Sequence, residues 1–222
     1  NLTLSPSTEP VPFNHLHRLT GALHKWLGPD NEWHDGISLY SFGWLEGGRG
    51  DDGHLTFPEG AGWRISFYNE DAAQQVQNGI LQDPEVFAGM RVVEAEVQTT
   101  PAFADRYLFK VDAPVVARRR REDGSREYLI YDDERADHAL TQTLRAKMRA
   151  AGLGDAGRAS VRFDRGYGGA RTKLATIEKG GHAVKHKASL CPVIVEGSET
   201  AVRFAWNVGV GELTGSGFGA LK

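Results

Sequence analysis

Residues 16–27 read LHRLTGALHKWL, and the arrangement of the first half of the chain can be worked out from this stretch. Its apolar residues recur at three- and four-residue spacing, which places Leu16, Leu19 and Leu23 on one face of an α-helix. The dipeptide Gly28-Pro29 ends the pattern, because neither residue favours the continuation of a helix. We therefore expect an amphipathic helix from about residue 14 to residue 28.

Short segments typical of strands lie on both sides of this helix. They are residues 2–4 before it and residues 37–45 and 63–68 after it, with a further short strand at residues 54–57. Asp71 can cap a second helix that runs to about residue 81, and residues 90–99 alternate apolar side chains with glutamate, as a strand does. The order strand, helix, strand, strand, helix, strand is the ferredoxin-like arrangement, which RNA-recognition domains share.

The second half of the chain begins at about Pro101 and repeats this pattern in part. A helix is expected at residues 134–151, where leucine and methionine again form one stripe. Strands are expected at residues 106–116, 128–131, 160–163, 174–177, 183–195 and 201–208, and a second helix is not evident. We thus predict an α+β protein of two tandem ferredoxin-like (RRM-like) modules, residues 1–100 and 101–222, of which the second is degenerate.

Composition narrows the class of protein. The 222 residues carry 26 Lys and Arg against 29 Asp and Glu, so any site for a polyanion must be a local patch. The one cysteine, Cys191, excludes an intramolecular disulfide and a multi-cysteine zinc site, and we expect a buried thiol in a reducing compartment. No apolar run reaches the roughly 18 residues that span a membrane, so a cytoplasmic protein is expected. Because residue 1 is Asn rather than Met, we expect the natural start to lie upstream.

The C-terminal residues 209–222, GVGELTGSGFGALK, place five glycines around one aromatic residue. They follow an apolar run that is expected to be a strand. Glycine adopts positive φ without steric cost and lets a phosphate approach the backbone N–H groups, so a strand that leads into such a loop indicates anion binding. The segment matches neither a P-loop nor a dinucleotide-binding turn.

Histidines are concentrated near the N-terminus. His15 and His17 lie on the first expected helix and are interpreted as surface or partly packed residues, because no pair has the spacing of a metal site. His34 differs, since it is expected in a loop, where an imidazole that titrates near neutrality can act as a general base or acid. No metal and no cofactor are expected.

These segments together resemble the repeat-cleaving CRISPR-associated endoribonucleases of the repeat-associated mysterious protein (RAMP) superfamily, which are tandem ferredoxin-like RNA binders. The resemblance rests on residues 11–27, 34–36, 39–43 and 128–131, and on the glycine-rich residues 209–219. It implies metal-independent cleavage of CRISPR precursor RNA beside a repeat stem. The 2'-OH would attack the adjacent phosphate and leave a 5'-hydroxyl and a 2',3'-cyclic phosphate.

The same resemblance implies that His34 is the catalytic general base or acid. The second group stays open among three residues. Tyr40 follows a few positions later on a strand, His24 lies late on the helix that enters the His34 loop, and Lys25 could stabilise charge from the same turn.

Binding of the repeat RNA is expected to involve basic residues and the glycine loop. Arg118 to Arg121 form a basic cluster at a hairpin, and Lys185 and Lys187 point to the same face of a strand. A positive stripe of this kind suits the backbone of an RNA stem. The expected RNA-binding residues are Lys25, Arg118, Arg119, Arg120, Arg171, Lys173, Lys185, Lys187, Gly209, Gly211, Gly215, Gly217 and Gly219.

The expected partners are CRISPR repeat RNA and proteins of a CRISPR effector complex, without DNA or a membrane, and the protein would act as a monomer or homodimer. An alternative function is that of a non-catalytic RNA-binding subunit of a CRISPR effector with the same fold. The two functions differ in whether the loop histidine takes part in cleavage.

Overall fold

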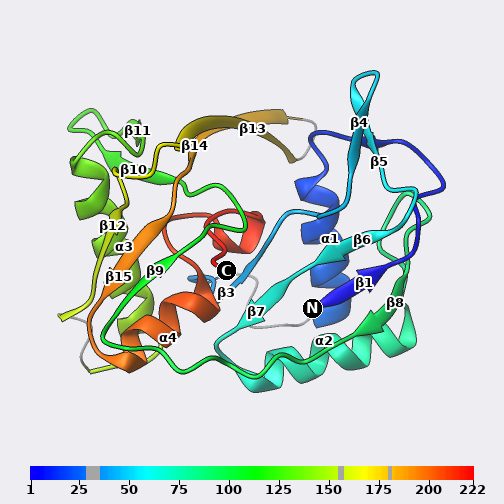
Figure 1. Ribbon diagram of the computed structural model, residues 1–222, viewed down its shortest axis with the longest axis horizontal. Helices are drawn as coiled ribbons and strands as arrows, with labels where there is room; N and C mark the ends of the chain where they lie inside the picture. Colours follow the sequence, from blue (N-terminus) through cyan, green and yellow to red (C-terminus); the bar gives the residue numbers. More distant parts are fainter. Residues whose placement is uncertain (29–35, 155–157, 180–181) are drawn as a thin grey trace.

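The computed structural model describes residues 1–28, 36–154, 158–179 and 182–222 (Figure 1). Two repeats of similar topology lie side by side in it. The main elements of the first repeat are β1 (Leu2–Leu4), α1 (Leu16–Leu27), β3 (Tyr40–Phe42), β6 (Ala61–Trp63), β7 (Ile65–Phe67), α2 (Glu70–Gln82) and β8 (Val92–Ala95). Their order along the chain is the one predicted from the sequence, except that β6 and β7 take the place of the single strand expected at residues 63–68.

Pairing of the strands gives the first repeat its ferredoxin-like sheet. β1 lies between β6 and β8 and is antiparallel to both, while β7, which follows β6 directly, pairs with β3. The register Leu2↔Trp63 and Leu4↔Ala61 puts these four side chains on the buried face. A small extension of three strands, β2 (Val11–Pro12), β4 (Arg49–Asp51) and β5 (His54–Thr56), adjoins this repeat.

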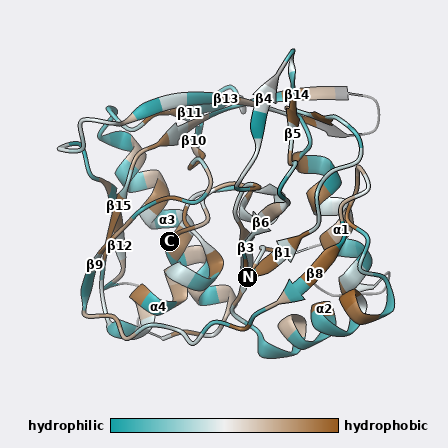
Figure 2. Ribbon diagram, turned by 45° about the vertical axis from the view of Figure 1, so that its right-hand side comes forward, coloured by the Kyte–Doolittle hydropathy of each residue, from teal (hydrophilic) through white to brown (hydrophobic). Residues whose placement is uncertain are grey.

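Both helices of the first repeat pack through one face, and Figure 2 shows their hydrophobic and hydrophilic residues as alternating bands. In α1 the buried face consists of the predicted leucines together with Ala22 and Trp26, and Gly28 with φ +83° follows its last residue. In α2 the cap is Asn69 rather than the expected Asp71: the Asn69 side chain accepts a hydrogen bond from the Asp71 N–H at 2.7 Å.

The main elements of the second repeat are β9 (Arg106–Phe109), α3 (Arg135–Ala150), β12 (Ser160–Phe163), β15 (Val193–Glu196) and α4 (Glu199–Val208). Their sheet has the order β12-β15-β9, and a single β-bridge between Val111 and Leu221 adds the C-terminal segment beyond β9. Counted within each repeat, the strands lie in the order second, third, first, fourth in both. In the second repeat the fourth strand is reduced to a bridge.

The prediction of a strand at residues 201–208 is wrong, because these residues form helix α4. The second repeat therefore contains both of its helices. Ser198 caps α4 by accepting a hydrogen bond from the Ala201 N–H at 3.1 Å. The buried residues Ala201, Val202, Ala205 and Val208 follow the helical period, but a run this rich in apolar residues also fits the period of a strand.

Two hairpins are added to the second repeat. The first consists of β10 (Ala117–Arg120) and β11 (Arg126–Leu129). The second consists of β13 (Arg171–Lys179) and β14 (His182–Leu190), and it extends from the second repeat across to α1 of the first (Figure 1). The long strand expected at residues 183–195 is divided into β14 and β15 by Cys191 and Pro192.

Two hydrophobic clusters fill the interior. One contains the buried residues of the first repeat together with Val116, Ala175, Ala188 and Phe218 from the second half of the chain. The other contains α3, α4 and the strands of the second repeat, and it includes Cys191. Burial raises the pKa of the Cys191 thiol to about 11, as expected for a packed residue rather than a reactive one.

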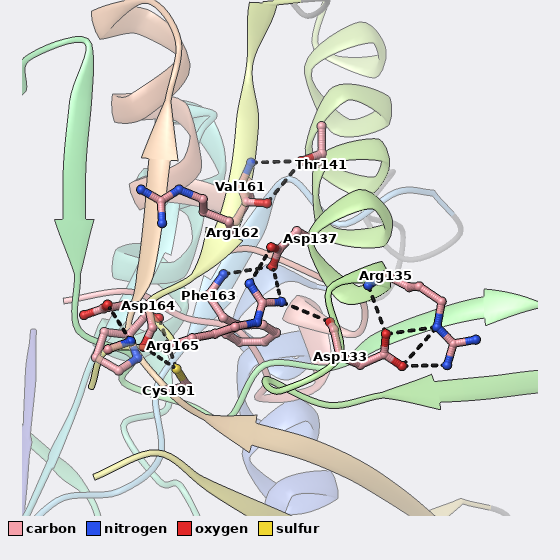
Figure 3. A network of polar contacts seen from close by, with 12 residues as sticks. Asp133, Arg135, Asp137, Thr141, Val161, Arg162, Phe163, Asp164, Arg165 and Cys191 are labelled. Carbon is pink, nitrogen blue, oxygen red and sulfur yellow. Dashed lines mark hydrogen bonds and ion pairs between the residues drawn. The ribbon is translucent and has the colours of Figure 1, made fainter. Parts of the chain in front are cut away.

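Polar side chains fasten α3 to the edge strand β12 (Figure 3). The Thr141 hydroxyl donates to the Val161 carbonyl at 3.1 Å and accepts from its N–H at 2.9 Å. Asp137 accepts the Phe163 N–H at 3.0 Å and forms an ion pair with Arg165 at 2.6 Å. These contacts satisfy backbone groups of an edge that would otherwise be open. Within the described residues, no helix is both long and apolar enough to cross a membrane.

Candidate active site

His24 and Tyr40 meet at the candidate site. His24 lies in the last turn of α1 and Tyr40 is the first residue of β3, and the Tyr40 hydroxyl is 3.3 Å from His24 Nε2. The segment that joins α1 to β3 carries His34, which lies outside the described residues. Two of the three candidates for the second catalytic group are thus brought together, near the two ends of the segment that contains His34.

Tyr40 is much less accessible than His24. Its side chain is 3% exposed, whereas His24 is half-buried. Burial raises the pKa of the Tyr40 phenol, although a hydrogen bond from the Ser38 side chain opposes the rise. A phenol of this kind stays protonated near neutral pH. Tyr40 is therefore suited to orient the His24 imidazole through Nε2, while the other ring nitrogen of His24, Nδ1, is buried.

The glycine-rich loop, residues 209–219, packs directly against β3. A side chain at Gly215 would place its Cβ 2.5 Å from Ser38 Oγ and 2.8 Å from the Tyr40 hydroxyl oxygen. The indole N–H of Trp44 donates to the Gly217 carbonyl at 2.7 Å. Only glycine allows this close approach, so the loop acts as a backbone surface against which Tyr40 rests.

Most of the glycine-rich loop is buried, and Phe218 is fully buried in the core of the first repeat. The N–H groups of Gly209 and Gly219 donate to the carbonyls of Ala205 and Pro114, at 2.8 Å and 2.9 Å. The loop was expected to bind an anion through its N–H groups, but these two N–H groups form hydrogen bonds within the protein. Phosphate binding by its glycines stays a prediction.

Lys147 supports the same loop from the second repeat, a role that was not predicted from the sequence. Its ammonium group donates to the Thr214 hydroxyl at 2.7 Å and to the Val208 carbonyl at 3.0 Å. Lys147 is 4% exposed. The signal in the sequence was its spacing, since Lys147 falls on the apolar stripe of α3, three residues after Leu144.

Lys25 occupies the turn that carries His24 but reaches a different place. Its ammonium group lies 2.8 Å from the Asp83 carboxylate and donates to the Glu85 carbonyl at 2.6 Å. Both partners belong to the segment after α2. Lys25 is therefore held away from the His24–Tyr40 pair, and its expected contact with RNA stays a prediction.

The basic cluster at β10 is largely paired with carboxylates. Arg118 forms an ion pair with Glu212 of the glycine-rich loop, and its side chain is only 8% exposed. Arg119 is paired with Glu127, and Arg120 is exposed at the end of the strand. The hairpin predicted here is confirmed, but much of its positive charge is compensated within the protein.

The β13–β14 hairpin divides its cations between two faces. Lys185 and Lys187 are exposed on either side of the buried His186, so they share the outward face as predicted. Lys173 is opposite Ala188 and Arg171 is opposite Leu190, which puts this pair on the other face. The Lys173 ammonium lies 5.7 Å from the centre of the Trp44 ring.

A second tyrosine–histidine pair lies on the other side of the glycine-rich loop. The Tyr128 hydroxyl is 2.8 Å from His186 Nδ1, and the His186 ring contacts that of Phe218 with 5.7 Å between their centres. Burial, with Arg118 nearby, lowers the pKa of His186. This pair too was missed from the sequence. In the part of the chain that the structure describes, no three His, Cys, Asp or Glu side chains gather as a metal site would need.

Comparison with known families shows to which family the chain belongs. Residues 97–222, more than half of its length, match the family model described as CRISPR associated protein Cas6, C-terminal. The chain belongs to the Cas6 family of CRISPR-associated proteins. Members of this family are CRISPR endoribonucleases. A search of the curated proteins finds no match to the chain.

Solved structures are similar in fold to the chain over its whole length. A Cas6-related protein from Pyrococcus furiosus has 17% identity and a TM-score of 0.79, and covers 100% of this chain and 96% of its own. A CRISPR associated protein Cas6 has 19% identity and a TM-score of 0.78, with the same coverage. A RAMP protein that binds different RNA substrates has 19% identity and a TM-score of 0.72, and covers 100% of this chain and 97% of its own. These likenesses establish the tandem ferredoxin-like fold of both repeats.

Proposed function

We propose that this protein is a metal-independent endoribonuclease that binds CRISPR repeat RNA and cleaves the precursor transcript. Membership of the Cas6 family and the likeness to an RNA-binding RAMP protein support the choice of substrate. The observation that carries the proposal is the contact of 3.3 Å between His24 and Tyr40, at the two ends of the segment that contains His34.

Cleavage proceeds by transfer of the phosphoryl group within the RNA. A general base takes the proton of a 2'-OH, and that oxygen forms a bond to the adjacent phosphorus. The bond from phosphorus to the 5'-oxygen breaks, and a general acid protonates the leaving oxygen. The products are a 2',3'-cyclic phosphate and a 5'-hydroxyl. Water is not consumed, and no metal ion or cofactor takes part.

The two proton-transfer roles fall to His34 and His24. His34 supplies one of them from the segment between α1 and β3. We assign the other to His24, whose Nε2 lies 3.3 Å from the Tyr40 hydroxyl that orients it. Each such role is worth about 10²- to 10⁴-fold in rate, which is enough for a slow processing enzyme.

Binding of the RNA is assigned to surfaces outside this pair. The outward face of β14, with Lys185 and Lys187, offers exposed positive charge to a phosphate backbone. Arg120 and Arg171 are exposed as well.

We also propose that the chain divides into two folding modules near residue 100, each with its own ferredoxin-like sheet.

Incubation of repeat RNA with the protein in EDTA tests the proposal. We expect one cut in each repeat, with the end groups identified by mass spectrometry of the fragments. His34→Ala should abolish cleavage and leave RNA binding largely intact. If the wild-type protein binds the repeat without cutting it, the function is that of an RNA-binding subunit instead. If His34→Ala cuts at the wild-type rate, the catalytic assignment is wrong.

A further inference from the structure

Lys147 is a buried cation at the junction of the two repeats. It lies on α3, 4% exposed, where its neighbours Leu144 and Met148 are part of the hydrophobic core. Its ammonium group donates to the carbonyl of Val208, the last residue of α4, and to the hydroxyl of Thr214. Burial lowers the pKa of Lys147 to about 7. Such a costly placement calls for a role that an apolar side chain would not fill.

The turn that Lys147 holds has a strained backbone. Thr214–Ser216 form one turn of 3-10 helix, preceded by Leu213 at φ +63° and followed by Gly217 at φ +83°. The left-handed region is unfavourable for leucine, and residues held there persist only when surrounding contacts fix them. The hydrogen bond from Lys147 to Thr214 is a contact of this kind, made at the first residue of the turn.

The opposite side of the same turn rests on the candidate active site. The backbone of Gly215 approaches the Tyr40 hydroxyl so closely that a Cβ there would be 2.8 Å from its oxygen. Thr214 and Gly215 are adjacent, so a shift of the turn toward or away from Lys147 changes the space around that hydroxyl. The same hydroxyl contacts His24.

We propose that Lys147 is a positioning residue for RNA cleavage, which holds the Thr214 turn against Tyr40 and thereby fixes the orientation of His24. This inference rests on the proposed function. Lys147 belongs to the second repeat, whereas the tyrosine–histidine pair belongs to the first. The buried cation therefore makes the geometry of the site depend on the packing of the two repeats against each other.

Two variants remove the hydrogen bond between Lys147 and Thr214, one at the donor and one at the acceptor. Lys147→Met keeps the length of the side chain and removes the donor, and Thr214→Val keeps the shape and removes the acceptor. Each should lower the single-turnover rate constant of cleavage about tenfold, with the Kd for repeat RNA within about twofold of wild type. Arg149→Met, at an exposed position of the same helix, is the matched control and should change neither value.

A double-mutant cycle asks whether Lys147 acts through Tyr40. The variant Lys147→Met with Tyr40→Phe should cut no more slowly than Tyr40→Phe alone, because the same interaction has already been removed. Tyr128→Phe, the matched tyrosine on the other side of the loop, should leave the rate unchanged. Rate losses that multiply in the double variant would overturn the inference.

A measurement that does not need cleavage separates this inference from the proposed function. The imidazole nitrogens of His24, observed by NMR with labelled histidine, should shift in Lys147→Met and Thr214→Val but not in Arg149→Met. An unchanged His24 signal in a folded variant overturns the inference. Absence of cleavage by the wild-type protein overturns the proposed function alone. If Lys147→Met does not fold, as judged by circular dichroism, the milder Thr214→Val decides.

Discussion

Two tyrosine–histidine pairs flank the glycine-rich loop, one from each repeat, and they differ in exposure. In the first, the Tyr40 hydroxyl is 3.3 Å from His24; in the second, the Tyr128 hydroxyl is 2.8 Å from His186. His24 is half-buried and lies in the last turn of α1, near the segment that carries His34. His186 is 7% exposed and lies within the nine-residue strand β14.

The surroundings of each pair indicate what it can do. A general acid or base must touch its substrate and carry a proton near working pH. His186 is enclosed, and burial and Arg118 lower its pKa, so it stays neutral and serves to fasten β14 to β11. His24 is less buried as a residue than His186 and lies next to the segment that carries His34. The same two side chain types are therefore assigned to catalysis in the first repeat, as proposed above, and to packing in the second.

The largest effect that we expect separates the two histidines. His24→Gln should lower the single-turnover cleavage rate constant by at least about 10²-fold, because it removes a proton-transfer group. His186→Gln should change that constant by less than about threefold and should instead lower the thermal midpoint of unfolding. Rate constants measured at saturating protein, below the unfolding midpoint of both variants, give the comparison.

A larger rate loss in His186→Gln than in His24→Gln would reverse the assignment of the two pairs. Equal and small losses would mean that neither histidine transfers a proton, and that the reaction depends on His34 and on groups of the RNA itself.

The next effect concerns Lys147, which holds the turn between the two pairs. Its pKa of about 7 in the folded protein lies below the value of 10.5 for an ordinary lysine. Between about pH 7 and pH 10.5 the unfolded chain thus binds more protons than the folded chain. The free energy of unfolding therefore rises with pH across this window. Its steepest slope is about 1.4 kcal/mol per pH unit. In Lys147→Met this contribution should be absent.

Urea unfolding between pH 7 and pH 8.5 tests this prediction. The quantity compared is the free energy of unfolding of the wild type minus that of Lys147→Met at each pH. Burial is the cause of the shift, and the partners of Lys147 are the neutral Val208 carbonyl and Thr214 hydroxyl. The Cys191 thiol has its pKa raised from 9.0 to about 11, which acts in the opposite direction at higher pH. A difference that does not vary with pH would show that Lys147 keeps its charge in the folded state.

Much of the fold could be predicted from periodicity. The helical spacing of leucine in α1 and the glycine that follows it were sufficient to place that helix, and β12 has the predicted bounds. α4 was missed because its apolar residues satisfy both the helical and the strand period. Its local signs were the cap residue Ser198, the acidic Glu199 in the first turn and Gly209 directly after the helix.

The candidate site was less predictable, because its contacts join elements that are distant in the chain. The sequence left Tyr40, His24 and Lys25 as equal candidates, and only the packing of α1 against β3 shows that the first two meet. It also gave no sign that Gly215 would lie against Tyr40. The role of Lys147 was not predicted, since its hydrogen bonds join α3 to the distant glycine-rich loop.

The smallest expected effect tests the strand that the second pair supports. His186 lies between Lys185 and Lys187, so its burial turns both lysines outward. Each phosphate contact contributes about 0.7 to 0.9 to the slope of log affinity against log salt concentration, and Lys185→Gln with Lys187→Gln should lower the slope by this amount for each lysine. Affinity should fall a few-fold, while the cleavage rate at saturating protein should not change. Lys110→Gln, at another exposed lysine of the second repeat, is the control for charge. If the slope is the same in the double variant as in this control, β14 does not bind RNA, and the second pair then supports packing alone.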